Sequence, residues 1–172
     1  DRLGVVDNAG NIVWSDQYML LLAKEISTIY DNPKIIMDVK CSKMFFDEVK
    51  KFNCDPIMYR TGHSPIKEKM KELNSPLSGE MSGHVCYGDD FYGYDDAMYV
   101  GLRLLRIISS EEKTLSELMS VFPKTIATPE IRFDVLERRK FEIIDEIKKR
   151  LSNIRGQVID IDGIRVENEL GW

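Results

Sequence analysis

Ile35-Ile36-Met37-Asp38-Val39 decides the fold, because it is a short, almost continuous apolar run. A run of this length is typical of a strand buried on both faces of a parallel sheet. Before it, apolar residues recur at helical spacing from about Asp16 to Tyr30, with Ser15 as the expected N-cap. Asn32-Pro33 ends this predicted helix, so the strand begins immediately after it.

The same alternation continues along the chain. The further elements that we expect are, in order, a helix after Ser42, a strand from Pro56 to Tyr59, a helix capped by Ser64, a helix from Asp95 or Asp96 through Ile108, and a short helix behind the capping box Thr114-Leu115-Ser116-Glu117. Strands that alternate with helices in this way predict an α/β fold, with a mostly parallel sheet and helices on both faces.

The segments before and after this region do not continue the alternation of strands and helices. At the start, Leu3 to Asp7 is a compact apolar strand, followed by the turn Asn8-Ala9-Gly10-Asn11. After Pro123 the expected elements are a strand from Thr128 to Val135, a helix from Lys140 to Leu151 and a hairpin from Gln157 to Val166 that turns at Asp162-Gly163. The main domain is therefore expected at residues 12–123, and residues 124–172 are expected to form an incomplete α+β unit.

Composition excludes several classes of protein. The 172 residues are 43% apolar, which is enough for one good core or for one domain and part of another. The net charge is −5, and 24 basic residues are interleaved with 29 acidic ones, which argues against nucleic acid as a partner. The apolar runs are too short for a membrane span. Three cysteines without a CxxC spacing indicate free thiols in a reducing cytoplasm.

The hexapeptide Gly79-Glu80-Met81-Ser82-Gly83-His84 is the main candidate for chemistry. It gathers a carboxylate, a hydroxyl and an imidazole between two glycines that let the backbone bend. Glu80 can accept two hydrogen bonds, Ser82 can donate or accept one, and His84 can pair with an anion or carry a proton. These groups suit a polar, hydroxyl-rich ligand, although an ordinary polar turn has the same composition.

Two other candidates follow predicted strands, as the hexapeptide does. Lys40 follows Val39, and His63 comes after the strand that ends near Tyr59. Because ligands bind at the carboxyl ends of parallel strands, Lys40, His63 and Glu80 are expected to converge on one rim of the sheet. Lys40 is alternatively a solvated lysine, and His63 a turn residue. The acidic residues around the loop 91–94 are either a metal site or a solvated loop with a helix cap.

Four stretches together resemble the α-D-phosphohexomutase superfamily, and most closely its bacterial phosphomannomutase/phosphoglucomutase members. The stretches are Asp1 to Asp7, Asp38 to Ser42, Thr61-Gly62-His63-Ser64 and the hexapeptide from Gly79 to His84. Met81 corresponds to the hexose type of the sugar loop. The resemblance runs over the whole chain, but the family's enzymes are several hundred residues long and have four domains.

The resemblance implies a reaction and a role for each candidate. A phosphoserine passes its phosphoryl group to a hexose phosphate, and the bisphosphate formed turns over and returns its other phosphate. Mg²⁺ neutralises the phosphoserine. The roles implied are a metal ligand for Asp1, an active-site arginine for Arg2, contacts near the transferring proton and phosphate for Lys40 and His63, a grip on the sugar's 3- and 4-hydroxyls for Glu80 and Ser82, and a further substrate contact for His84.

The chain also departs from the family pattern. The serine segment, two metal carboxylates and the phosphate-binding loop are not in these 172 residues. The absence of an initiator methionine and the end at Gly171-Trp172 also indicate an internal piece, in which residues 1–11 end the metal-loop domain and 12–123 form the sugar-binding domain. The piece alone is expected to be inactive, with hexose phosphates and the missing domains as its partners. Two alternatives stay open: a non-catalytic sugar-phosphate-binding fragment, and a sugar-isomerase-like enzyme that uses Glu80 and His63 as acid and base.

Overall fold

The computed structural model describes residues 1–151 and 154–172. Contacts between residues divide the chain into two compact units, Asp1–Lys124 and Thr125–Trp172. Each unit is described by itself. Among the residues that the structure describes, no helix combines the length and the apolar character that a membrane crossing requires.

A four-stranded sheet lies at the centre of the first unit. Its strands, in spatial order, are β4 (Asp55–Tyr59), β3 (Lys34–Asp38), β5 (Leu77–Gly79) and β6 (Val85–Tyr87). β3 is parallel to β4 and to β5, whereas β6 is antiparallel to β5. The predicted mostly parallel sheet is therefore confirmed, with the decisive stretch in an inner strand. The antiparallel pairing of β6 was not part of the prediction.

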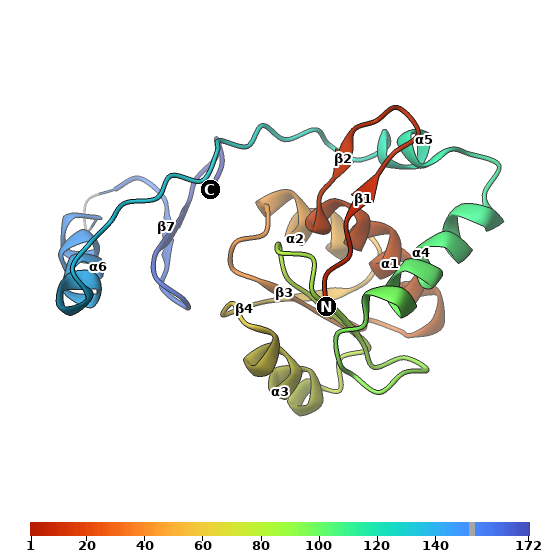
Figure 1. Ribbon diagram of the computed structural model, residues 1–172, viewed down its shortest axis with the longest axis horizontal. Helices are drawn as coiled ribbons and strands as arrows, with labels where there is room; N and C mark the ends of the chain where they lie inside the picture. The colour runs from red at the N-terminus through yellow and green to blue at the C-terminus, as the bar shows by residue number, and fades with distance from the viewer. Residues whose placement is uncertain (152–153) are drawn as a thin grey trace. The chain divides into compact units, whose positions relative to one another are not determined.

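Helices cover both faces of this sheet, as Figure 1 shows. They are α1 (Ser15–Ile29), α2 (Lys43–Lys50), α3 (His63–Leu73) and α4 (Ala97–Ser110); the short helix α5 (Leu115–Met119) lies beside the turn before β2 instead, where the Ser116 N–H donates to the Asn8 side chain at 3.0 Å. Ile35 and Met37 of β3 belong to the large core cluster that includes residues of α1, α2 and α4. Ile36, on the opposite face, packs in a smaller cluster with Ile66 and Met70 of α3. Alternate residues of one strand thus bury against different helix layers.

Helix starts were predicted correctly where a capping side chain decides them. Asp96 accepts a hydrogen bond from the Tyr99 N–H at the start of α4, and Thr114 forms the predicted capping box with Glu117. These caps use the first, otherwise unpaired N–H groups of a helix.

Two predicted caps are wrong, each by one or two residues. Ser15 is the first residue of α1, and the Trp14 N–H before it is satisfied by the Gln17 side chain at 2.9 Å. Ser64 lies inside α3, which begins at His63 after Gly62. Gly62 has φ +125°, a conformation that side chains rarely adopt, so the backbone turns into the helix before Ser64 is reached.

A short hairpin precedes α1. β1 (Val5–Val6) pairs antiparallel with β2 (Ile12–Val13), so the strand is shorter than the predicted Leu3–Asp7. The intervening turn is held by Asp7, whose side chain accepts hydrogen bonds from the backbone N–H groups of Ala9 and Asn11. The turn itself is where the sequence predicted it.

The second unit contains the 3₁₀-helix η1 (Glu137–Arg139), helix α6 (Lys140–Arg150) and the antiparallel strands β7 (Gln157–Ile159) and β8 (Arg165–Glu167). The predicted helix and hairpin are confirmed. The predicted strand Thr128–Val135 is wrong, because this stretch forms neither strand nor helix. Its apolar residues Ile131 and Phe133 are exposed, so the alternating pattern has no sheet to pack on in this chain.

The cysteines allow a first test of the fold. All three are free and buried, as predicted for free thiols. Burial raises the pKa of Cys54 and of Cys86 to about 11. At pH 8 only about one thousandth of each thiol is then the reactive thiolate. We expect both residues to resist iodoacetamide in the native protein and to react in urea, measured by mass spectrometry of the peptides. Equal labelling rates in the two states would contradict this packing.

Candidate functional site

Most of the sequence-predicted site residues lie at the carboxyl ends of β3, β4 and β5, whereas Asp1 and Arg2 lie in the N-terminal segment, where Arg2 forms an isolated β-bridge with His84. Lys40 lies in the turn between β3 and α2, His63 is the first residue of α3, and Glu80 directly follows β5. The rings of His63 and His84 are 5.8 Å apart between centroids, so the loops after β4 and β5 meet. The lysine is the more exposed member, with its side chain about half accessible.

Glu80 is the most distinctive group at this rim. Its residue is only 4% exposed, and its Oε2 accepts a hydrogen bond from the Ser82 hydroxyl at 3.2 Å. The other oxygen, Oε1, is buried and has no hydrogen-bond partner among the described residues. A buried carboxylate oxygen without a donor is costly unless a donor is supplied. Oε1 is therefore suited to accept a hydrogen bond from a hydroxyl group of a ligand.

The loop that carries Glu80 is a tight turn tied to the N-terminal segment. The Glu80 N–H donates to the His84 carbonyl at 2.8 Å, and the Gly83 N–H donates back to the Glu80 carbonyl at 3.0 Å. The Leu3 N–H donates to the Gly83 carbonyl at 3.0 Å. Gly83 has φ +93°, and a Cβ there would lie 2.9 Å from the Leu3 carbonyl oxygen. The turn thus requires glycine on two grounds.

Gly83→Ala tests this turn. Backbone strain together with the clash against Leu3 is expected to lower the free energy of unfolding by about 1–3 kcal/mol. Gly93→Ala is the matched control, because Gly93 also has positive φ but has open space around its Cβ position. Urea denaturation of the two variants separates strain from close approach. A larger loss for Gly93→Ala than for Gly83→Ala would contradict the assigned contact.

His84 is held from both sides of its ring. The Arg2 Nε–H donates to His84 Nε2 at 3.1 Å, and His84 Nδ1 lies 2.9 Å from Asp95 Oδ2. Because arginine can only donate, Nε2 must be the acceptor, and Nδ1 then carries the proton that is donated to Asp95. This fixes the tautomer of a neutral imidazole and orients its basic nitrogen toward Arg2.

The Asp95 carboxyl faces the His84 ring. Burial raises the pKa of this carboxyl, and the hydrogen bond with His84 lowers it. A carboxylate at this position favours a proton on Nδ1 and would stabilise the imidazolium that forms if Nε2 gained a proton. The pair has the geometry of a base with its orienting carboxylate.

Among the described residues, neither Asp1 nor the acidic loop belongs to a cluster of side chains that could hold a metal ion. Asp1 is exposed and its Oδ1 accepts a hydrogen bond from the Arg2 N–H at 2.8 Å. Across residues 1–151 and 154–172, no group of three or more His, Cys, Asp or Glu side chains could hold a metal ion. One carboxylate does not supply the oxygen ligands that Mg²⁺ needs, so Asp1 by itself does not fit the ion.

Of the two alternatives for the acidic loop, the structure supports the helix cap. Asp96 caps α4, and Asp89 forms a buried ion pair with Arg103 at 2.9 Å. Asp95 is the member that contacts the site, through His84. Sequence reasoning missed the contacts of Asp95 and also those of Asp38, which lies at the end of β3 with Lys40 Nζ 3.9 Å from its Oδ2.

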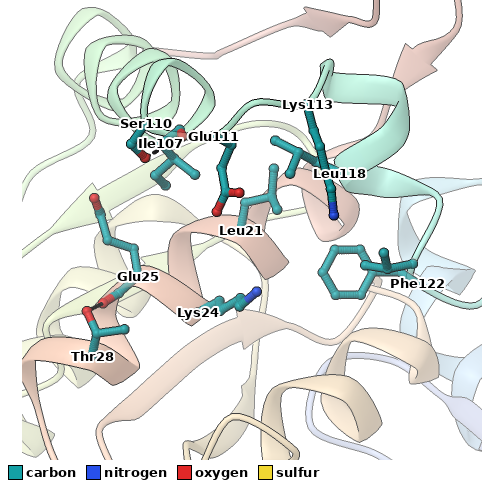
Figure 2. A pocket seen from close by; sticks show the side chains of 11 residues that line it. Leu21, Lys24, Glu25, Thr28, Ile107, Ser110, Glu111, Lys113, Leu118 and Phe122 are labelled. Atoms are coloured by element: carbon teal, nitrogen blue, oxygen red, sulfur yellow. Dashed lines mark hydrogen bonds between the residues drawn. The ribbon is translucent and has the colours of Figure 1, made fainter.

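A groove of about 300 Å³ lies elsewhere in the first unit, among residues of α1, α4 and the segment around α5. Figure 2 shows side chains from these elements facing one another, among them Lys24, Glu111 and Phe122. None of the residues that line the groove is a sequence-predicted site residue. The groove is therefore separate from the rim that carries Glu80.

Comparison with known families identifies the family of the domain that carries this rim. Residues 14–125 match the family described as phosphoglucomutase/phosphomannomutase, alpha/beta/alpha domain III. The chain belongs to this family. The matched range covers the sheet, its helices and the three loops that carry Lys40, His63 and Glu80.

Individual relatives agree with this assignment. The phosphomannomutase/phosphoglucomutase of Pseudomonas aeruginosa is 40% identical over 172 residues, which are 100% of this chain and 37% of the relative. The phosphoglucomutase of Neisseria meningitidis is 37% identical over 97% of this chain and 36% of its own length. A crystal structure of a phosphoglucomutase/phosphomannomutase family protein from Burkholderia thailandensis has a TM-score of 0.89 at 37% identity, covering 98% of this chain and 35% of that one.

The resemblance read from the motifs is therefore confirmed at the level of the family and its α/β fold. The chain spans about a third of the length of these relatives, 37% of the Pseudomonas protein. By their names the relatives are mutases, a class of isomerase, that act on phosphorylated glucose and mannose. Within the phosphoglucomutase/phosphomannomutase family, the rim described above is the candidate active site of the domain.

Proposed function

We propose that the parent protein interconverts hexose 1-phosphates and 6-phosphates through a phosphoserine and a bisphosphorylated sugar, and that this chain supplies sugar recognition. One observation carries the proposal. Glu80 is buried beside Ser82 with its Oε1 unpartnered among the described residues, at the strand ends where α/β proteins bind ligands. The family membership supports a sugar phosphate as the ligand.

The pairing of Glu80 and Ser82 suits the sugar's 3- and 4-hydroxyls. Glu80 Oε1 can accept a hydrogen bond from one hydroxyl, and the Ser82 hydroxyl, whose oxygen lies 3.2 Å from Oε2, can contact the neighbouring hydroxyl. These two hydroxyls occupy roughly exchangeable positions when the sugar turns end for end. The same two side chains would then serve both orientations of a bisphosphate, which the proposed reaction requires.

The basic groups at the rim suit the phosphate end of the ligand. Arg2, Lys40 and His63 would contact phosphate, since a local basic pocket is needed in a protein whose net charge is −5. His84, oriented by Asp95, would hold or move the proton of the reacting hydroxyl. The resemblance supports Asp1 as one Mg²⁺ ligand, completed by other segments.

Assay of the full-length natural protein tests the proposal. With glucose 1-phosphate and with mannose 1-phosphate, we expect the corresponding 6-phosphates, detected by phosphorus NMR. A sugar isomerase would instead convert glucose 6-phosphate to a ketose phosphate, and a binding fragment would leave every sugar phosphate unchanged. Either of these results would overturn the proposal. The 172 residues alone are expected to be inactive, since they lack the serine segment; their three buried free thiols fit a cytoplasmic protein.

A further inference from the structure

Asp38 ends β3 with a fully buried side chain, and its neighbours come from all three loops of the rim. Its Oδ1 accepts hydrogen bonds from the Met81 N–H at 3.0 Å and from the Cys41 thiol at 2.9 Å. Its Oδ2 accepts one from the Thr61 hydroxyl at 3.3 Å and lies 3.9 Å from Lys40 Nζ. One carboxylate thus connects the segments after β3, β4 and β5.

Each of these donors lies within two residues of a candidate site residue in the sequence. Met81 lies between Glu80 and Ser82, Cys41 follows Lys40, and Thr61 is two residues before His63. A carboxylate that is removed from water costs free energy, and paired hydrogen bonds are required to offset it. A fold that needed only a filled core at this position could use an apolar residue. The polar contacts of Asp38 instead all point to the loops that hold the site.

We propose that Asp38 is a positioning residue, whose carboxylate sets the Glu80–Ser82 segment relative to Lys40 and His63. The inference rests on the proposed phosphohexomutase function. Asp38 itself is fully buried and acts through the Met81 N–H, the Cys41 thiol and the Thr61 hydroxyl. Because the three loops share one acceptor, a shift of any one of them changes the geometry of the other two.

Asp38→Asn in the full-length enzyme tests the positioning role. Its amide oxygen can replace only one carboxylate oxygen, and its NH₂ group would face the Thr61 hydroxyl and the Lys40 ammonium. We expect kcat/KM to fall by about 100-fold on glucose 1-phosphate and on mannose 1-phosphate, the scale of a displacement of about 1 Å in a site. Amide hydrogen exchange at Met81 should become faster, because a neutral amide oxygen in place of Oδ1 is a weaker acceptor for this N–H than a carboxylate oxygen.

Asp89→Asn is the matched control. Asp89 is a buried aspartate paired with Arg103, and it follows β6, whose antiparallel direction places it at the opposite edge of the sheet. The Asp89→Asn variant should lose about as much stability as Asp38→Asn, but its kcat/KM should stay within about threefold of the wild type and hydrogen exchange at Met81 should be unchanged. If Asp38→Asn does not fold, Thr61→Val removes one donor and is expected to lower kcat/KM about threefold to tenfold.

The outcomes separate the two claims. A wild-type enzyme without mutase activity would overturn the proposed function. Hydrogen exchange at the Met81 N–H tests the positioning role of Asp38 independently, because this measurement does not require an active enzyme. Unchanged Met81 exchange in Asp38→Asn, or kcat/KM within threefold of the wild type in a folded Asp38→Asn, would overturn the positioning role. An equal loss of kcat/KM in Asp89→Asn would also overturn it, because the effect would then follow stability alone. Unchanged kcat/KM in Thr61→Val would overturn it where Asp38→Asn does not fold.

Discussion

His84→Ala in the full-length enzyme is expected to lower kcat by about 10²- to 10⁴-fold, the usual contribution of a positioned acid or base. The ring is held by Asp95 with its proton on Nδ1, which leaves Nε2 as the acceptor. A substrate hydroxyl that replaces the Arg2 N–H at Nε2 could pass its proton to that nitrogen. Steady-state kinetics with glucose 1-phosphate across pH measures the effect.

Asp95→Asn provides a graded comparison for this prediction. The asparagine oxygen can still accept the Nδ1 proton, but the negative charge that stabilises an imidazolium is lost. Its kcat should fall below that of the wild type, but less than that of His84→Ala. If His84→Ala raises KM while kcat is unchanged, His84 contributes binding alone and the proton role is wrong.

Glu80→Ala in the full-length enzyme is expected to lower kcat/KM on both sugars by a similar factor. Charge-assisted hydrogen bonds of a buried carboxylate are worth about 1.5–3 kcal/mol, which corresponds to about 10- to 150-fold in rate. Glucose and mannose phosphates differ at the 2-hydroxyl, and a side chain that binds the 3- and 4-hydroxyls does not distinguish them. The ratio of the two kcat/KM values should therefore stay constant.

Two comparisons sharpen the Glu80 prediction. Glu80→Gln keeps the shape but loses the charge, so its loss should lie between the wild type and Glu80→Ala. Galactose 1-phosphate, the 4-epimer of glucose 1-phosphate, already misplaces one of the two hydroxyls, so Glu80→Ala should affect it little. A tenfold change in the preference for mannose over glucose would show that the assigned hydroxyl contacts are wrong.

The fold of the first unit could be predicted because local signals agree with tertiary packing. The short apolar run from Ile35 to Val39 favours a buried strand, because it is bounded by Pro33 and is too short for a typical helix. The caps at Asp96 and Thr114 could be predicted because these side chains commonly accept hydrogen bonds from the first N–H groups of a helix. The start of α3 could not be placed, because it depends on the positive φ of Gly62 rather than on the Ser64 side chain. Backbone conformation at a glycine leaves little trace in composition.

The second unit shows a different limit. Thr128–Val135 has the alternating pattern of a strand, but a strand is stable only when a neighbouring strand supplies hydrogen bonds and packing. The helix α6 and the hairpin β7–β8 form because their own hydrogen bonds are local. The pattern therefore predicted correctly those elements whose partners are nearby in the sequence.

Only part of the candidate site could be predicted from the sequence. Lys40, His63 and Glu80 could be placed on one rim because each follows a parallel strand. Asp38 and Asp95 were missed, because their roles depend on contacts across sequence separations of 43 residues to Met81 and 11 residues to His84. A buried aspartate at the end of an apolar strand, such as Asp38, was the available signal, since such a residue needs partners.

A crystal structure of the full-length enzyme with glucose 1-phosphate tests the central claim most directly. We predict the sugar's 3- and 4-hydroxyls within hydrogen-bond distance of the Glu80 carboxylate and the Ser82 hydroxyl, with Oε1 of Glu80 accepting one of them. Bound sugar whose 3- and 4-hydroxyls contact neither Glu80 nor Ser82 would contradict the account.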